Sequence, residues 1–171
     1  MKKLFCFLFL PLLFSGMAYT QEINKIIMDP RIDREVVVGY CNRDGLQWGE
    51  FLESYVEEYD IYTPEIKYLK KIRKKLDDTK IVIVLGTWCS DSKTQVPRFL
   101  KVLDQIDFNE SNLTMIGVDR SKTAGDLNIR DLSIERVPTF IFYHDGFEIG
   151  RIIETPETTL ERDTYKILRK K

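Results

Sequence analysis

Residues 81–92 read Ile81-Val82-Ile83-Val84-Leu85-Gly86-Thr87-Trp88-Cys89-Ser90-Asp91-Ser92. The run from 81 to 85 is apolar without a break, which is typical of a strand buried on both faces of a sheet. A helical period begins after the cysteine. The stretch therefore predicts a buried strand that ends in Trp-Cys and leads into an amphipathic helix, whose apolar positions are Val96, Phe99, Leu100, Leu103 and Ile106.

Cys89 is predicted to be a reactive thiol. The first turn of a helix offers free backbone N–H groups and the positive end of the helix dipole, and both favour the nucleophilic thiolate. Ser92 stands three residues later, where a C-x-x-C site has its second sulfur, so the motif is monothiol. Asp91 opposes the thiolate and Lys93 favours it, which leaves the net effect open. The alternative for Cys89 is an inert buried thiol.

Further elements are predicted on both sides of this stretch. Helical spacing of apolar residues indicates a helix over 48–59 and another that begins at Pro64. Residues 113–119 read as a second central strand, and 123–134 as a short helix with a loop. An Asp145-Gly146 turn joins two strands, 139–143 and 147–153. Thr158 and Glu161 have the spacing of a capping box before a last helix.

This order of elements, with Trp-Cys at the end of the first core strand, resembles the thioredoxin fold. Pro97 follows Cys89 by eight residues, Val137-Pro138-Thr139 opens the hairpin, and Gly146 follows Pro138 by eight residues. The resemblance covers residues 66–171 and is strongest to exported bacterial thioredoxin-like proteins. It implies an α/β fold, a three-layer α/β/α sandwich with a mixed central sheet and an N-terminal helical extension.

The resemblance also implies a substrate-binding surface. The proline that matches Pro138 is cis in the family and packs against the active cysteine. Val137 would then supply the backbone that pairs with a substrate chain, with Thr139 as its neighbour. Trp88 is either a core or rim aromatic or part of an apolar substrate surface. Ile83 stands where many family members bury an acid that assists proton transfer.

The N-terminus has the plan of a secretory signal. Lys2 and Lys3 precede an apolar run over 4–14 and the segment Gly16-Met17-Ala18, which has small residues at the spacing of a cleavage site. The run is shorter than the ~20 residues that span a bilayer, so we expect cleavage between 18 and 20 and no stable membrane span afterwards. The organisation predicted is a signal peptide over 1–18, a helical extension over 22–62 and a thioredoxin-like domain over 63–171. The protein would be periplasmic or secreted.

Composition and charge exclude several kinds of function. The 26 basic and 27 acidic residues are balanced, and no basic run stands beside aromatic residues, so nucleic acid is not an expected partner. One histidine and scattered cysteines offer no metal-ligand spacing, and neither a metal nor a cofactor is expected. His144 is predicted to lie in a turn, on the order of 20 Å from the Pro138 end of its strand at ~3.4 Å per residue. That position argues against Cys-His catalysis.

Cys41 is the only other cysteine after removal of the signal, because Cys6 lies within it. It is either a packed small hydrophobic residue or a candidate resolving thiol for Cys89. A disulfide requires Cα atoms within ~7 Å, which sequence does not establish.

Two functions follow from these residues. The first is an exported monothiol thiol-disulfide oxidoreductase, in which Cys89 attacks protein or small-molecule disulfides and Ser92 assists it. Ser92 cannot resolve the mixed disulfide, so an external reductant thiol is the expected partner. The alternative is a non-catalytic module that binds peptides or proteins in the cis-proline groove.

Overall fold

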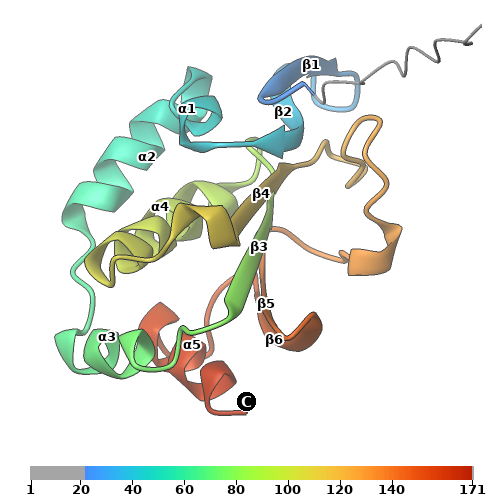
Figure 1. Cartoon of the computed structure of the whole chain (residues 1–171). Coiled ribbons are helices and arrows are strands. Elements are labelled where there is room, and N and C mark those ends of the chain that lie inside the picture. The colour runs from blue at the N-terminus through green and yellow to red at the C-terminus, as the bar shows by residue number, and fades with distance from the viewer. Residues whose placement is uncertain (1–21, 171) are drawn as a thin grey trace, which may run out of the picture.

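The computed structural model describes residues 22–170, so the predicted signal peptide lies outside the described part. A mixed six-stranded sheet in the order β1-β2-β4-β3-β5-β6 forms its centre (Figure 1). Only the β3–β4 pair is parallel within this sheet. The strands are β1 (Lys25–Asp29), β2 (Arg34–Cys41), β3 (Thr79–Leu85), β4 (Leu113–Gly117), β5 (Thr139–His144) and β6 (Phe147–Ile153). The helices are α1 (Arg43–Leu46), α2 (Gly49–Ile61), α3 (Ile66–Arg73), α4 (Ser90–Gln105) and α5 (Leu160–Leu168), with 3-10 turns η1 (Glu110–Asn112) and η2 (Arg130–Leu132).

β3 is the central strand of the fold, as its apolar run predicts. Ile83 lies opposite Met115 of β4 on one side and Phe140 of β5 on the other. Because side chains alternate along a strand, Ile83 faces the main core while Val84 faces the opposite side of the sheet. The Trp88-Cys89 segment therefore lies just beyond the C-terminal end of β3, in the middle of the sheet.

The helices cover one face of the sheet (Figure 1). Phe99 of α4 packs against Phe140 and Phe142 of β5, with ring centroids 4.7 Å and 6.0 Å apart. Phe51 and Tyr55 of α2 join the same core. Burial of these large rings is the main source of stability on this side of the sheet.

The segment between β4 and β5 covers the other face. Ala124 and Val137 are buried there against Val84 and Ile116. This segment, orange in Figure 1, contains the short helix η2 and is otherwise irregular, in agreement with its polar sequence. The predicted α/β class with a mixed central sheet is confirmed, and this irregular segment forms the second outer layer.

The N-terminal extension differs from the helical prediction. Only its second half, α1 and α2, is helical, whereas β1 and β2 form a hairpin that adds two strands to the sheet. Val36-Val37-Val38 explains the difference, because β-branched residues favour strands and all three are buried. Gly117 lets β2 approach β4 closely, since a Cβ there would collide with the Val37 carbonyl oxygen.

The cap of α5 also differs by one residue from the prediction. Thr159, rather than Thr158, is the N-cap, and its hydroxyl accepts a hydrogen bond from the Arg162 backbone N–H. Glu161 is fully buried and accepts a hydrogen bond from the Tyr62 hydroxyl instead of completing a capping box. A tertiary contact has therefore replaced the local one.

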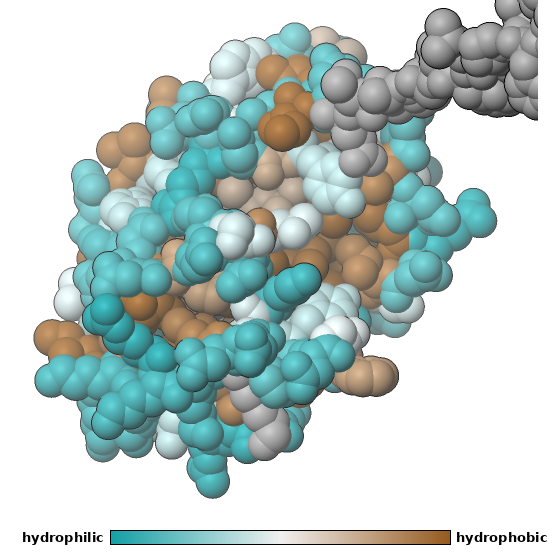
Figure 2. Space-filling model, in the orientation of Figure 1, coloured by the Kyte–Doolittle hydropathy of each residue, from teal (hydrophilic) through white to brown (hydrophobic). Residues whose placement is uncertain are grey.

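The surface of the described part is mixed. In Figure 2 hydrophilic side chains cover most of the visible face, with apolar atoms showing in the hollows between them. Within residues 22–170, none of the helices has the length and apolar character needed to cross a bilayer.

Candidate functional site

Cys89 is the N-cap residue of α4 and lies four residues after the end of β3. Its backbone N–H donates to the Gly86 carbonyl at 2.9 Å, and its carbonyl accepts from the Lys93 N–H at 3.0 Å. The side chain is half-buried. The sulfur thus lies at the first turn of a long helix, beside backbone N–H groups that the helix leaves without partners.

Val137 contacts Cys89 from a distant part of the chain. The Cys89 thiol donates to the Val137 carbonyl oxygen at 3.2 Å. The Val137–Pro138 peptide bond is cis, and both residues are buried with Thr139. The Thr139 hydroxyl donates to the Arg136 carbonyl at 2.6 Å, which fixes the start of β5. The structure therefore brings Val137, the first residue of the predicted substrate-binding segment, to the sulfur.

Ser92 is fully buried one turn along α4. Its hydroxyl oxygen accepts a hydrogen bond from the Gly86 N–H at 3.2 Å. That bond joins the helix to the end of β3 and satisfies a buried donor. Ser92 consequently braces the turn that holds Cys89.

Trp88 is held in a fixed orientation by three groups. Its indole N–H donates to the Val118 carbonyl at 2.9 Å. The Arg120 guanidinium carbon lies 4.4 Å from the ring centroid, a cation–π geometry. The ring packs closely over Gly86, where a Cβ would come within 2.6 Å of it. Trp88 is half-buried, so part of the ring remains accessible beside Cys89.

Asp29 links the N-terminal hairpin to Trp88, which sequence reasoning missed. Its carboxylate accepts from the Arg120 backbone N–H at 2.6 Å and from the Arg31 N–H at 2.8 Å. These bonds, that of Arg120 above all, hold the pKa of Asp29 below its usual value. Arg120 in turn stacks on Trp88. The sequence gives no signal for a contact between residues 29 and 120.

Glu50 ties α2 to the helix of the site. One carboxylate oxygen lies 3.1 Å from the Lys93 ammonium and 3.1 Å from the Arg34 guanidinium. The hydrogen bond from Lys93 is the main reason that the pKa of Glu50 is lowered. The Lys93 charge, expected to act on the sulfur, is thus shared with a carboxylate.

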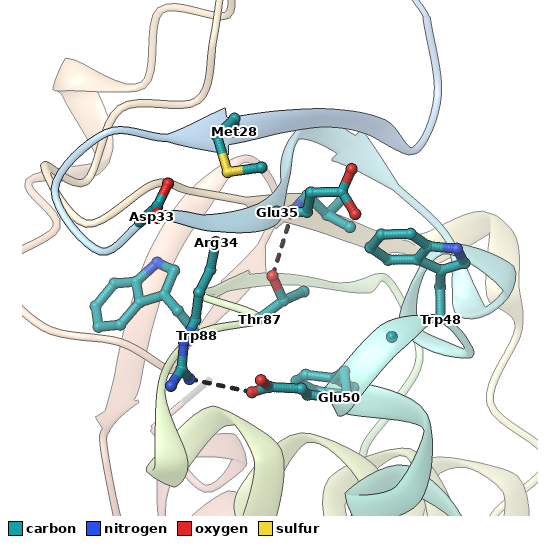
Figure 3. Close-up of a pocket in the computed structure, with 11 residues that line it drawn as sticks. Met28, Asp33, Arg34, Glu35, Trp48, Glu50, Thr87 and Trp88 are labelled. Carbon is teal, nitrogen blue, oxygen red and sulfur yellow. Dashed lines mark hydrogen bonds and ion pairs between the residues drawn. The ribbon is translucent and has the colours of Figure 1, made fainter.

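A cavity of about 310 Å³ lies beside Trp88, and we call it the Trp48–Trp88 pocket. Figure 3 shows the two tryptophans on opposite sides, Met28 above and Glu50 below. The Thr87 hydroxyl accepts from the Val37 N–H at 3.3 Å and so joins the hairpin to this wall. The lining comes from the β1–β2 hairpin, the start of α2 and the Thr87-Trp88 turn, and it includes Met28, Glu35, Trp48, Glu50, Thr87 and Trp88.

The structure does not bring Cys41 to Cys89. Both thiols are free, and Cys41 is buried opposite Met115 of β4. β4 lies between β2 and β3, so Cys41 of β2 is two strand spacings, on the order of 10 Å, from the backbone of β3. That exceeds the ~7 Å between Cα atoms that a disulfide allows. Burial raises the pKa of Cys41 to about 12, which makes it a poor nucleophile at neutral pH.

His144, the other residue considered for catalysis, lies at the opposite end of β5 from the Val137–Pro138 segment that contacts the sulfur. His144 ends β5 at the hairpin turn, where its Nε2 atom is 3.5 Å from the Asp145 carboxylate. Within the described range 22–170, no three His, Cys, Asp or Glu side chains form a group able to hold a metal ion.

The chain is similar to proteins of known name. A thioredoxin from Coprinus comatus is 30% identical over 105 residues, which cover 60% of this chain and 95% of that protein. Thioredoxin Asp f 29 from Aspergillus fumigatus is 29% identical over 82 residues, which cover 47% of this chain and 70% of that protein. A scan against models of known protein families finds no match.

A solved structure shares the fold. A protein of unknown function from Pseudomonas aeruginosa superposes with a TM-score of 0.53 at 11% identity. The superposition covers 72% of this chain and 84% of that one. At this identity the likeness concerns the fold alone.

Proposed function

Because this chain belongs to the thioredoxin family, we propose that it is a thiol-disulfide oxidoreductase whose nucleophile is Cys89. The observation that carries the proposal is the position of the sulfur, half-buried at the start of α4 and 3.2 Å from the Val137 carbonyl. In general, the free N–H groups of a first helical turn and the helix dipole are features that favour a reactive cysteine at this position.

In the first step the Cys89 thiolate attacks one sulfur of a substrate disulfide. A new disulfide bond forms between Cys89 and that sulfur, the original S–S bond breaks, and the second substrate sulfur leaves as a thiolate that takes a proton from solvent. The thiol proton of Cys89, which the Val137 carbonyl accepts in this structure, must leave before the attack. The Val137 carbonyl is then free to accept a backbone N–H of a substrate chain.

In the second step an external thiol releases the product. Ser92 cannot attack the mixed disulfide, and Cys41 is buried with a raised pKa. A thiolate from solution therefore attacks the substrate sulfur of the mixed disulfide and frees Cys89. A second external thiol completes reduction of the substrate, so both electrons come from the external thiol pool.

We also propose that the protein is exported to the periplasm or secreted. The support is the order of Lys2-Lys3, the apolar run over 4–14 and the small residues Gly16 and Ala18. The size of the mature chain tests this. A first residue near Tyr19 or Gln21, found by mass spectrometry of the protein outside the cytoplasm, is the expected result, and an intact N-terminus inside the cell contradicts it.

The catalytic proposal is tested by turnover of a small neutral disulfide, bis(2-hydroxyethyl) disulfide, with glutathione as external thiol. We expect the wild-type protein to accelerate its reduction and Cys89→Ser to lose the acceleration. Cys41→Ala is the matched control and retains it, because a buried thiol takes no part.

A peptide-binding function without catalysis gives a different pattern in the same experiment. Cysteine-free extended peptides would bind wild type and Cys89→Ser equally, and neither protein would accelerate the reduction. That result replaces the oxidoreductase with a binding module built on the Val137 backbone.

A further inference from the structure

The Trp48–Trp88 pocket adjoins the proposed reaction centre, yet the N-terminal segment builds most of it. Trp88 forms one wall and directly precedes Cys89, so their Cα atoms are ~3.8 Å apart. The volume of about 310 Å³ is at the small end of the ~300–1,000 Å³ found for ligand sites. A pocket of that size suits one long side chain of a polypeptide substrate.

The walls of the pocket are largely apolar. Trp48 and Met28 keep 43% and 56% of their surface exposed, although both are large hydrophobic residues. Figure 3 shows both side chains bordering the pocket, with Trp88 on the far side. An exposed pair of this kind gains stability when an aliphatic chain covers it.

The charges around the pocket are unequal. Three carboxylates and one guanidinium belong to its lining, and Glu50 is already paired with both Arg34 and Lys93, each at 3.1 Å. Asp33 and Glu35 are exposed, and neither has an ion-pair partner among residues 22–170. Apolar walls with two unpaired carboxylates complement a side chain that has an aliphatic stem and a cationic end.

We propose that the Trp48–Trp88 pocket binds a lysine or arginine side chain of the polypeptide whose disulfide reacts with Cys89. The stem lies along Trp48 and Met28, and the cationic end meets Glu35 or Asp33. Because Trp88 lines the pocket and directly precedes Cys89, the basic residue is expected within a few positions of the reacting cysteine. This inference rests on the proposed function of Cys89 and adds a preference among substrates to it.

The test compares short peptides that carry one cysteine as a mixed disulfide with 2-mercaptoethanol. The residue two positions from the cysteine is lysine, norleucine or glutamate. Cys89 attacks the peptide sulfur, the bond between Cys89 and the peptide forms, and 2-mercaptoethanol leaves as the thiolate. Mass mapping of the full chain assigns the adduct to Cys89, and its rate of formation is measured at low and high salt.

We expect the lysine peptide to react about tenfold faster than the glutamate peptide at low ionic strength, with norleucine between them. High salt reduces the ratio, because these carboxylates are exposed. Asp33→Asn and Glu35→Gln lower the ratio toward one. Glu57→Gln removes the same charge from an exposed position of α2 outside the pocket, and it keeps the wild-type ratio.

Two further measurements separate this inference from the function on which it rests. Reaction with bis(2-hydroxyethyl) disulfide shows whether Cys89 is active at all. Calorimetric binding of peptides with serine in place of cysteine reports on the pocket without chemistry.

An inactive Cys89 contradicts the proposed function, whereas preferential binding of the lysine peptide, weakened by Glu35→Gln, still supports the pocket. Equal rates and equal affinities for the lysine and glutamate peptides overturn the pocket proposal, even with an active Cys89. A lysine preference that survives both Asp33→Asn and Glu35→Gln also overturns it.

Discussion

Among single residues, Ser92 has two roles in this site. It occupies the position that would supply a second thiol, and its hydroxyl satisfies the buried Gly86 N–H. The lack of a second thiol at position 92 limits the chemistry of Cys89, whereas the hydrogen bond to Gly86 contributes to stability. Alanine at position 92 tests the hydrogen bond alone, because it removes the hydroxyl without adding a sulfur.

Ser92→Ala is expected to lower the free energy of unfolding by about 1–3 kcal/mol, because the Gly86 N–H is left buried without an acceptor. Urea denaturation followed by circular dichroism measures the change. Ser90→Ala, at an exposed position of the same helix turn, is the control and should change stability by less than about 0.5 kcal/mol. Equal stability of Ser92→Ala and wild type would show that the bond to Gly86 does not matter.

Cys41 makes stability depend on pH in the alkaline range. Its folded pKa is about 12, above the ~8.5 of an unfolded thiol, so only the unfolded chain ionises between these values. The stabilisation is complete below about pH 8.5 and is lost as pH rises toward the folded pKa. We expect the stability advantage of wild type over Cys41→Ala to shrink from pH 8 to pH 10.5 in chemical denaturation. A constant difference over that range contradicts a buried, protonated Cys41.

Site residues whose role depends on their neighbours along the chain could be predicted from the sequence. Cys89 at the helix start and Ser92 in the same turn follow from spacing along the chain. Asp29 and Arg120 could not be predicted in this way, because the residues that this hydrogen bond joins are 91 positions apart in the sequence. The Lys93–Glu50 ion pair was not predicted for the same reason, since α2 and α4 come into contact only in the folded chain.

At the level of elements, the β1–β2 hairpin supports the site in addition to extending the sheet. Asp29 at the end of β1 binds the Arg120 backbone, and Arg120 stacks on Trp88. Thr87 accepts a bond from β2 on the other side. The hairpin thus contacts the two residues that precede Cys89, directly at Thr87 and through Arg120 at Trp88.

Asp29→Asn should loosen Trp88 while leaving the sheet intact. The amide can accept a bond through one oxygen only, so one of the two backbone N–H groups loses its acceptor. In a Trp48→Phe background, the fluorescence of Trp88 is expected to shift to longer wavelength and to become easier to quench. An unchanged spectrum and unchanged quenching would contradict the link.

The same carboxylate gives an acid dependence. Because its pKa is lowered in the folded state, Asp29 contributes stability above about pH 4, and this contribution is lost as pH falls through the folded pKa. The stability difference between wild type and Asp29→Asn should therefore narrow on acidification.

Elements with strong periodicity were predicted well, and those that depend on pairing were not. The 81–85 run, the 139–153 hairpin and the helices after Trp48 and Cys89 correspond to elements of the structure. The strands β1 and β2 were missed although Val36-Val37-Val38 has the composition of a strand. Their assignment depends on β4 as a partner, which a local pattern does not reveal.

In the whole molecule, residues 22–62 and 63–170 share one core. Phe51 is 2% exposed and belongs to the same buried cluster as Phe99 and Phe140. The boundary expected near residue 62 therefore divides the sequence but not the packing. A single cooperative unfolding transition follows from a single core of this size.

Phe51→Ala is expected to cost about 3–5 kcal/mol, as large-to-small changes of buried aromatic residues do. Leu52→Ala is the neighbouring control; Leu52 is 39% exposed, and its replacement should cost less than about 1 kcal/mol. Both values come from denaturant curves followed by tryptophan fluorescence and by circular dichroism. A loss below about 1 kcal/mol for Phe51→Ala would mean that the extension lies outside the cooperative core.

The most direct test of the nucleophilic role of Cys89 is site-resolved mass mapping of the native chain after exposure to bis(2-hydroxyethyl) disulfide at neutral pH. We predict a 2-hydroxyethylthio adduct, a mixed disulfide with 2-mercaptoethanol, on Cys89, none on Cys41 until the chain is denatured, and release of the Cys89 adduct by glutathione. A native Cys89 that stays unmodified, while the same residue reacts in the denatured chain, would contradict a nucleophilic role for Cys89.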